Sequence, residues 1–328
     1  MRTYILRRFL FMIISVLLMS FVAFVLIDLP PGDYVTMYVK QLEISGTKVT
    51  ESMLESLKMQ YGFGQPFHIR YLKWIAGIIT KGDFGRSFQW NRPVIDLIVQ
   101  RLPSTVILSL LTIMFTYLVA IPIGIYSATH QYSIGDYIAT VFGFLGLAVP
   151  SFLLALVLVF FLYNNFGISP GGLFSPEYAD APWSMAKVLD FLQHMIVPVI
   201  VTGASGTAGL IRTMRATLLD ELSKDYVDTA RVKGLPERKL LYKYPVRVAI
   251  NPILSTLGWL LPSVFSGTTI VAIVVNVPTI GPLLLQGLMS QDMYLAGSII
   301  LILTVLTLIG TFISDILLAW SDPRIRYE

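Results

Sequence analysis

The stretch DYVDTARVKGLPERKLLYKYPVRVAINP, residues 225–252, is a basic segment that lies between two apolar runs. Apolar residues repeat at helical spacing in its first part, at Tyr226, Val227 and Ala230. Gly234 stands where a left-handed residue would end that helix, and Leu235 can supply the apolar contact of such a cap. Pro236 suits the first turn of a second helix, because the N–H that proline lacks is unpaired there anyway. The pattern predicts two short helices around a glycine and a place for a soluble partner, although a plain helix pair beside the membrane fits it too.

The composition is that of a membrane protein. Of 328 residues, 55% are hydrophobic and 13% are charged, against roughly a quarter charged in soluble domains. Crossing a bilayer takes about 20 apolar residues, and six runs approach or exceed that length: 9–27, 105–125, 138–163, 195–211, 257–275 and 296–318. Four prolines inside these runs are expected to kink or break them: Pro122, Pro150, Pro198 and Pro262. The net charge of +4 is explained by loop charges rather than by nucleic acid, and the absence of cysteine leaves no thiolate metal site.

Lys and Arg are concentrated in three segments that lie on one side of the membrane if the chain has six spans. These are the residues before the first run, the residues after the last run, and the segment 212–252. The loop 276–295 has no Lys or Arg, and 164–194 has only Lys187. Cytoplasmic loops carry the excess of positive charge. Both termini and 212–252 are therefore predicted to be cytoplasmic, with Gly172 and Asp292 external.

Short motifs along the chain resemble those of one family. They are LPPGD at 29–33, YGFGQP at 61–66, GDFGRSF at 82–88, RLPST at 101–105, VPSF at 149–152 and DPRIRY at 322–327. Asp228-Thr229-Ala230, followed by Gly234, is similar to the EAA loop of ABC importer permeases. Together the motifs resemble the dipeptide and oligopeptide permease family over nearly the whole chain. The chain departs from the EAA pattern where Asp228 replaces Glu, where Thr229 replaces the first Ala, and where Tyr244-Pro245-Val246-Arg247 replaces I-x-L-P.

The resemblance implies an all-α polytopic protein with six transmembrane helices and a type I ABC importer permease fold. It implies an N-terminal helix over 1–30, an external segment over 31–101, and a permease core over 102–328 that carries five spans and the cytoplasmic coupling loop 212–252. The residues implied to couple to an ATPase are Asp228, Thr229, Ala230, Arg231, Lys233, Gly234, Leu235 and Glu237. Ala230 and Gly234 would let the loop enter a cleft of the partner, with the charged residues at its rim. Simple solvation of those charges is the alternative.

The implied partners are a second related permease, two cytoplasmic ABC ATPases and an external solute-binding protein, in a bacterial or archaeal inner membrane. The substrate stays open among dipeptides, oligopeptides, glutathione, nickel and oligosaccharides, and the residues that bind it are unknown. No Gly-Lys dipeptide occurs, so the chain lacks the P-loop G-x-x-x-x-G-K-[ST]. Any ATP and Mg²⁺ are therefore expected on partner ATPases, with no cofactor and no catalytic residue in this chain.

Other classes of function fit the sequence less well. Residues 203–206, GASG, match the nucleophile motif of intramembrane serine proteases, but His194 lies about 16 Å along the same helix from Ser205 at 1.5 Å per residue. Close helix packing is the simpler reason for the small residues of 203–209. Three scattered histidines and no HExxH argue against a zinc hydrolase. An ATP-independent carrier or channel is the remaining alternative.

The segment 31–101 is too long for a plain connector, and two short helices are predicted in it. One follows a capping-box pattern at Ser52–Glu55, and the other runs from Pro66 to a stop at Lys81-Gly82. Tyr71 and Trp74 lie on one face of the second helix. We expect these rings at the lipid headgroups, with a rim that receives a delivery protein as the alternative. Asp28 and Asp315, near span ends, are expected to stay ionised beside water or basic partners.

Overall fold

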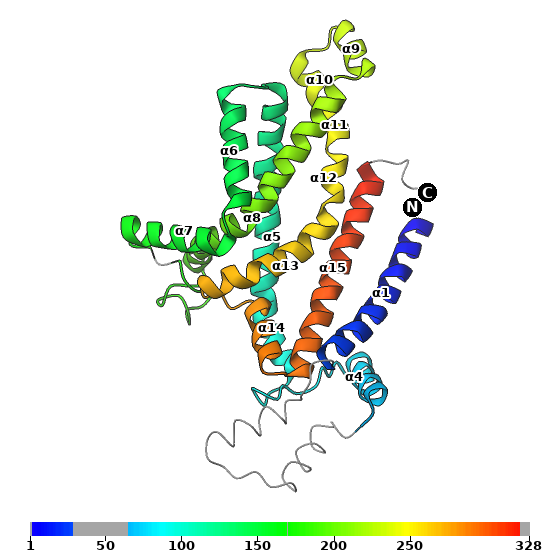
Figure 1. Cartoon of the computed structure of the whole chain (residues 1–328), viewed down its shortest axis with the longest axis vertical. Helices are drawn as coiled ribbons and strands as arrows, with labels where there is room; N and C mark the ends of the chain where they lie inside the picture. The colour runs from blue at the N-terminus through cyan, green and yellow to red at the C-terminus, as the bar shows by residue number, and fades with distance from the viewer. Residues whose placement is uncertain (1, 29–64, 169, 322–328) are drawn as a thin grey trace. The chain divides into compact units, whose positions relative to one another are not determined.

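The computed structural model describes residues 2–28, 65–168 and 170–321. The motifs at 29–33, 52–55 and 322–327, and most of 61–66, lie outside the described residues. Every regular element among the described residues is an α-helix (Figure 1). The helices are α1 (Arg2–Asp28), α4 (Phe67–Lys81), α5 (Val94–Thr129), α6 (Ile134–Ala148), α7 (Ser151–Phe166), α8 (Met185–Leu222), α9 (Asp225–Val232), α10 (Glu237–Lys243), α11 (Pro245–Ala249), α12 (Asn251–Ser255), α13 (Leu257–Val274), α14 (Ile280–Met289) and α15 (Met293–Ser321).

The chain divides into two compact units. Unit 1 comprises residues 1–9, 104–278 and 307–328, and unit 2 comprises residues 10–103 and 279–306. The helices α1, α5 and α15 each contribute to both units. The all-α prediction is confirmed for the described part of the chain.

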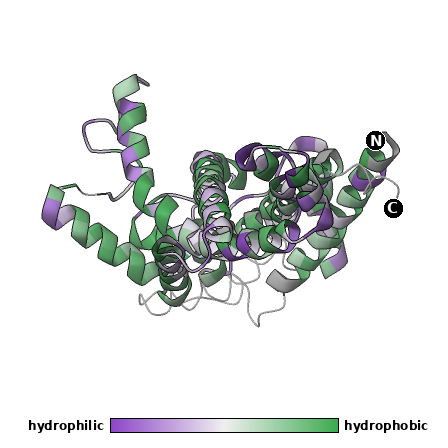
Figure 2. Cartoon of the chain, turned by 90° about the horizontal axis from the view of Figure 1, so that it is seen from above, coloured by the Kyte–Doolittle hydropathy of each residue, from purple (hydrophilic) through white to green (hydrophobic). Residues whose placement is uncertain are grey.

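Four helices of the described chain are long and apolar enough to cross a membrane: α1, α5, α8 and α15. The pair α6 and α7 would make a fifth span if it were counted as one, but the two helices are bent by 109°. The helix α13 has 18 residues, which at 1.5 Å per residue is about 27 Å, just short of the hydrocarbon thickness. The predicted count of six spans is therefore not reproduced exactly. Hydrophobic residues predominate in the ribbon of Figure 2, as expected for membrane helices.

The predicted run 138–163 is divided into α6 and α7 at Pro150, where a kink or break was expected. Val149 is extended, with ψ 124°, and caps the end of α6. Pro150, with ψ 134°, precedes α7. Proline disfavours the helical conformation in the residue before it and has no N–H to continue the ladder. The chain therefore turns at Val149-Pro150 and starts a new helix at Ser151.

The helix α8 is far longer than the predicted run 195–211. It has 38 residues and continues through Pro198, so it is about 57 Å long at 1.5 Å per residue. Ser184 caps its start by accepting a hydrogen bond from the Lys187 N–H at 3.2 Å. Residues 212–222, which the sequence assigned to a cytoplasmic loop, are its last three turns.

Small residues bring helices of unit 1 close together, as predicted. A Cβ added to Gly203 of α8 would lie 2.8 Å from the ring of Phe115, and one on Gly146 of α6 would lie 3.0 Å from the carbonyl oxygen of Ala204. No side chain fits at such distances, so these glycines permit the contact of α8 with α5 and with α6. Gly209 differs, because a Cβ there would meet nothing within 4 Å. Within residues 203–209, Gly203 thus allows close helix packing, whereas Gly209 borders open space.

In unit 2, α4 ends at Gly82, with φ +65°, as predicted. Its Trp74 is buried and donates its indole N–H to the Phe84 carbonyl oxygen at 3.3 Å. Trp74 also packs on the Phe24 ring of α1, with 5.4 Å between ring centroids. The expectation of a headgroup position is therefore wrong for Trp74, because protein covers its ring.

The predicted external motif at 82–88 is held by a buried carboxylate of unit 2. Ser87 donates its hydroxyl to Asp292 Oδ2 at 2.5 Å, and the Gln89 N–H donates to the same oxygen at 3.2 Å. Burial raises the pKa of Asp292, although these hydrogen bonds act in the opposite direction. Gly85, with φ +89°, lies so near Tyr294 that a Cβ would be 3.0 Å from its ring. The motif residues Gly85 and Ser87 are therefore fixed by Tyr294 in the first turn of α15 and by Asp292 just before it.

Candidate coupling site

The predicted helix, glycine, helix arrangement is confirmed. Gly234 has φ +76°, a left-handed conformation that glycine adopts without strain. The Leu235 N–H donates to the Ala230 carbonyl oxygen at 3.4 Å, and the Lys233 N–H donates to that of Thr229 at 3.1 Å. These bonds close the end of α9 in the way of a glycine cap. Pro236 lies one residue before α10, at the capping position rather than inside the first turn.

A small hydrophobic core stabilises this segment from within. Val227, Ala230 and Leu240 are buried together, and Leu235 and Tyr244 pack against them. The methyl group of Ala230 therefore lies inside the segment, where it allows α9 to approach α10. This position corrects the expectation that Ala230 helps the outer surface to enter a partner.

Arg231 links the two helices by charge. Its Nη1 lies 2.7 Å from Asp228 Oδ1, and its Nε lies 2.7 Å from Glu237 Oε1. Hydrogen bonding and charge attraction from Glu237, with a smaller part from Asp228, raise the pKa of Arg231 above its usual value. All three side chains are about half exposed or more, so solvent screens these ion pairs and they add little to stability. These ion pairs therefore fix the positions of the charged side chains on the surface of the loop more than they stabilise the loop.

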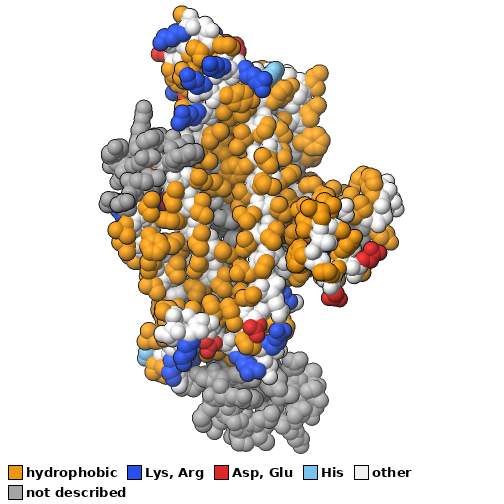
Figure 3. Space-filling view, turned by 180° about the vertical axis from the view of Figure 1, so that it is seen from behind, with side chains coloured by type: hydrophobic (Ala, Val, Ile, Leu, Met, Phe, Trp, Pro, Cys, Tyr) orange, Lys and Arg blue, Asp and Glu red, His pale blue; other side chains and the backbone are white. Residues whose placement is uncertain are grey.

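The outer surface of the segment combines positive charge with one exposed apolar side chain. Lys and Arg side chains gather over α9 and α10 at the end of unit 1 seen at the top of Figure 3. Val232 is 88% exposed, beside Lys233 and near Gly234, whose added Cβ would meet no atom within 4 Å. The tip thus presents one apolar side chain among basic ones. The side chains of Asp228 and Thr229 are also exposed.

A groove of about 660 Å³ separates this segment from the turn after α5. Tyr126, Thr129, His130 and Gln131 line one side, and Arg231, Glu237 and Tyr242 line the other. The turn at 130–133 and the α9–α10 segment thus lie at the same end of unit 1. This agrees with a topology in which both face the same compartment, although the turn has no Lys or Arg of its own.

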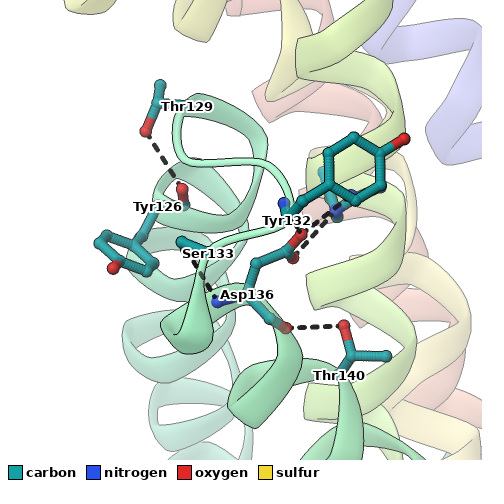
Figure 4. Close-up of polar contacts among 7 residues, drawn as sticks. Tyr126, Thr129, Tyr132, Ser133, Asp136 and Thr140 are labelled. Carbon is teal, nitrogen blue, oxygen red and sulfur yellow. Dashed lines mark hydrogen bonds and ion pairs between the residues drawn. The ribbon is translucent and has the colours of Figure 1, made fainter.

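A bidentate ion pair fixes the turn at 130–133 to α8 (Figure 4). Asp136 lies in the first turn of α6, and its carboxylate is 3.2 and 3.1 Å from Nε and Nη2 of Arg215. Asp136 also accepts the N–H of Tyr132 at 3.0 Å, while its own N–H donates to the Ser133 hydroxyl at 3.2 Å. Sequence reasoning missed this pair. The pattern Ser133-x-x-Asp136 is a capping signature that could have marked the helix start, but nothing local pointed to Arg215.

Replacing Asp136 by alanine should destabilise unit 1 by about 2 kcal/mol, because removing one partner of a buried pair leaves the other charge unpaired. This destabilisation is smaller than that of breaking a fully buried pair, because the Arg215 side chain is 31% exposed while that of Asp136 is 5% exposed. The thermal midpoint of the purified protein in detergent measures the effect. Asp220→Ala, at an exposed carboxylate on the same helix as Arg215, is the matched control. Equal midpoints for the two variants would contradict the prediction.

Other expected features have clear positions. Asp315 of α15 lies 3.2 Å from Arg8 of α1, as expected for an acid with a basic partner.

Ser205 lines a cavity of unit 1, and no histidine is among the described residues that line it. His194 instead has Nδ1 2.8 Å from the Asp190 carbonyl oxygen. The arrangement gives Ser205 no general base and so disfavours the serine protease alternative.

This fold and this loop define a polytopic helical membrane protein with a protruding glycine-capped segment. Residues 120–327 match the family "Binding-protein-dependent transport system inner membrane component", and residues 1–109 match "Binding-prot-dependent transport system membrane comp, N-term". The chain belongs to this family and is a permease subunit of an ABC importer.

Three curated relatives match along nearly their whole length. The chain is 34% identical over 328 residues to the oligopeptide transport system permease protein AppB of Bacillus subtilis, with 100% of both chains covered. It is 28% identical to the oligopeptide transport system permease protein OppB of Haemophilus influenzae, again with 100% of both covered. It is also 28% identical to the peptidoglycan transport system permease protein YejB of Agrobacterium fabrum, covering 100% of this chain and 99% of that protein.

Proposed function

We propose that this subunit forms half of the pathway by which an ATP-driven importer moves peptides across the inner membrane, and that α9 and α10 receive the ATPase. The peptide class rests on the relatives, two of which carry oligopeptide transport in their names. The observation that carries the coupling role is the α9–Gly234–α10 segment. It combines an internal core, a left-handed glycine and an exposed tip of Val232 and basic side chains.

The connection of this segment to α8 supplies a mechanism. Only Ser223 and Lys224 separate the end of α8 from the start of α9. Movement of an ATPase bound to α9 therefore reaches α8 through two residues. Arg215, two turns before the end of α8, carries that movement to α6 through Asp136. Closure of the ATPases would in this way tilt helices of unit 1 together and exchange an inward-open pathway for an outward-open one.

The proposed assembly contains a second related permease, two ATPase subunits and an external solute-binding protein. The tagged chain, purified from its own membranes, should bring two ATPase chains and a second permease with it. Reconstituted vesicles should then take up a tripeptide such as tri-alanine only when ATP is supplied on the ATPase side. Uptake that needs no ATP would instead support the ATP-independent carrier.

The chain on its own should bind no ATP, because it has no glycine-rich loop followed by Lys to hold the phosphates. Equilibrium binding of radiolabelled ATP to the chain purified without partners measures this directly. The same preparation after addition of the ATPases is the positive control. Saturable binding by the lone chain would contradict the proposal that hydrolysis belongs entirely to partners.

The orientation can be tested on a chain that has no cysteine of its own. Lys239 of α10 should be cytoplasmic, and Glu177 and Met289, both exposed, should be external. These two replace Gly172 and Asp292 as probes, because Gly172 has φ +84° and Asp292 is buried. An impermeant thiol reagent added to intact cells should label the Glu177→Cys and Met289→Cys variants and spare Lys239→Cys. The reverse pattern would overturn the proposed orientation.

A further inference from the structure

A cavity of about 780 Å³ opens in unit 1, apart from the α9–α10 segment. Its walls come from α5, α8 and neighbouring helices, and α8 contributes Thr202, Ser205, Gly209 and Arg212. Three of these four carry hydroxyl groups or a positive charge in a helix that is long and apolar enough to span a membrane. Polar side chains in such helices face protein interiors or cavities and mark sites of function.

Gly209 gives this cavity its width. A Cβ at Gly209 would meet no atom within 4 Å, whereas one at Gly203 of the same helix would lie 2.8 Å from Phe115. Helix packing therefore explains Gly203 but does not explain Gly209. The absence of a side chain at Gly209 keeps space free beside Arg212, on the next turn of α8.

A buried hydroxyl of the cavity wall has no partner in the described part of the chain. Thr112 of α5 is 0% exposed, and its Oγ1 has no hydrogen-bond partner among the described residues. The Oγ1 of Thr202, on α8, is also buried without a hydrogen-bond partner among the described residues. Both residues line the cavity. Both Oγ1 atoms are fully buried, so the two residues line the cavity through their other atoms and leave Arg212 as the charged side chain among the described residues that line it.

Two arginines of α8 differ in whether a carboxylate neutralises their charge. Arg215 is neutralised by the bidentate pair with Asp136. Arg212, three residues earlier, lines the cavity and has no carboxylate partner among the described residues. Its guanidinium lies 6.0 Å from the centre of the Phe144 ring, and its N–H groups have no hydrogen-bond partner among the described residues. An unneutralised guanidinium beside open space is a site for a carboxylate, which it can bind with two parallel hydrogen bonds.

We propose that this cavity binds the transported peptide, with Arg212 holding the C-terminal carboxylate. The inference rests on the proposed function for its substrate class and adds a residue of this subunit that recognises it. The C-terminal carboxylate is common to all peptides. A site built for it therefore accepts peptides of many sequences and leaves side-chain selection to the binding protein.

The cysteine-free chain allows a direct binding test. Gly209→Cys places a thiol in the cavity without a clash. The full chain, with the subunits that copurify, is placed in phosphatidylcholine nanodiscs, so that no anionic headgroup competes for Arg212. The rate of modification by a small charged methanethiosulfonate reagent is then measured while tri-alanine or tri-alanine amide is titrated. Tri-alanine should protect the thiol at a concentration about tenfold lower than the amide requires, as expected for one charge-assisted interaction.

Three variants isolate the role of Arg212. In the Gly209→Cys background, Arg212→Gln should remove the preference for tri-alanine over its amide, and Arg212→Lys should retain part of it. Arg92→Gln removes a cation from an exposed position before α5 and should leave the preference unchanged. Ser223→Cys, an exposed thiol position beyond the end of α8, should not be protected by either peptide.

The possible outcomes separate this inference from the proposed function. Equal protection by the acid and the amide, or a preference that survives Arg212→Gln, would overturn the role of Arg212. A thiol at 209 that is unprotected or unreactive would overturn the binding site itself, even if vesicles import tri-alanine with ATP. Protection with the expected preference but without ATP-driven uptake would keep the site and reject the importer function.

Discussion

Replacing Gly234 by leucine is expected to lower peptide transport per ATP hydrolysed by about tenfold or more while the membrane helices stay folded. The left-handed backbone at Gly234, with φ +76°, costs a residue with a Cβ about 1 kcal/mol or more. The strain alone is small against the stability of the whole protein. The leucine side chain, however, points into the space that a Cβ at Gly234 finds empty, where the proposed partner has to fit. The measurement is uptake and ATP hydrolysis in the same reconstituted vesicles.

Two further variants separate strain from the loss of fit. Gly167 ends α7 with φ +65°, and a Cβ there also meets nothing within 4 Å. Gly167→Leu therefore carries similar backbone strain at a position outside the proposed coupling site, and it should leave the ratio of uptake to hydrolysis unchanged. Gly234→Asn, a residue that tolerates the left-handed conformation, should fall between wild type and leucine. Normal coupling in Gly234→Leu would contradict the assignment of this loop.

The parts of the structure that local chemistry determines were predictable from the sequence. The α9–Gly234–α10 segment is signalled by helical periodicity, a glycine and a proline within twelve residues. The end of α4 at Gly82 is signalled in the same way. In both places the stop depends on a backbone conformation that glycine adopts most easily, so neighbouring residues suffice to determine it.

The break of the run 138–163 at Pro150 was expected, but the size of the bend between α6 and α7 was not predictable, because hydropathy reports composition and not direction. The run 138–163 is apolar throughout, and the 109° turn depends on Val149 adopting an extended conformation before Pro150. Proline alone does not decide the matter, since α8 continues through Pro198. In a membrane helix neighbouring helices can satisfy the backbone that proline disrupts, and that information is not local.

Partners that are distant in sequence explain the remaining differences. The end of α8 resembled a loop because basic residues begin at Arg212, but Asp136, 79 positions from Arg215, neutralises one of them. The motif residue Ser87 is likewise held by Asp292, 205 positions away. Pairing over such separations arises from the packing of helices and leaves no pattern in a single sequence. For the same reason, the cavity beside Arg212 could not be predicted from the sequence.

Reversing the charge of Asp228 should weaken binding of the ATPases about a hundredfold. The Asp228 side chain is 67% exposed in this chain, so the loss of its pair with Arg231 should cost the stability of the fold little. A lysine covered by the partner would instead leave a buried unpaired or like-charge contact costing several kcal/mol. Affinity of the purified ATPases for Asp228→Lys in detergent measures the effect. Asp180→Lys, at an exposed acid predicted to be external, is the matched control.

A double variant decides whether Asp228 acts on the partner or only on its own loop. Asp228→Lys with Arg231→Glu restores the pair within α9 with its polarity reversed, because the two side chains are 2.7 Å apart in the native loop. If Asp228 served only to hold Arg231, the double variant would recover the affinity of the wild type. We expect it to stay at least about tenfold weaker, because the charges presented to the ATPase remain reversed. Full recovery would assign Asp228 to the loop alone. Undiminished affinity after deletion of residues 222–240 would show that the ATPases dock elsewhere.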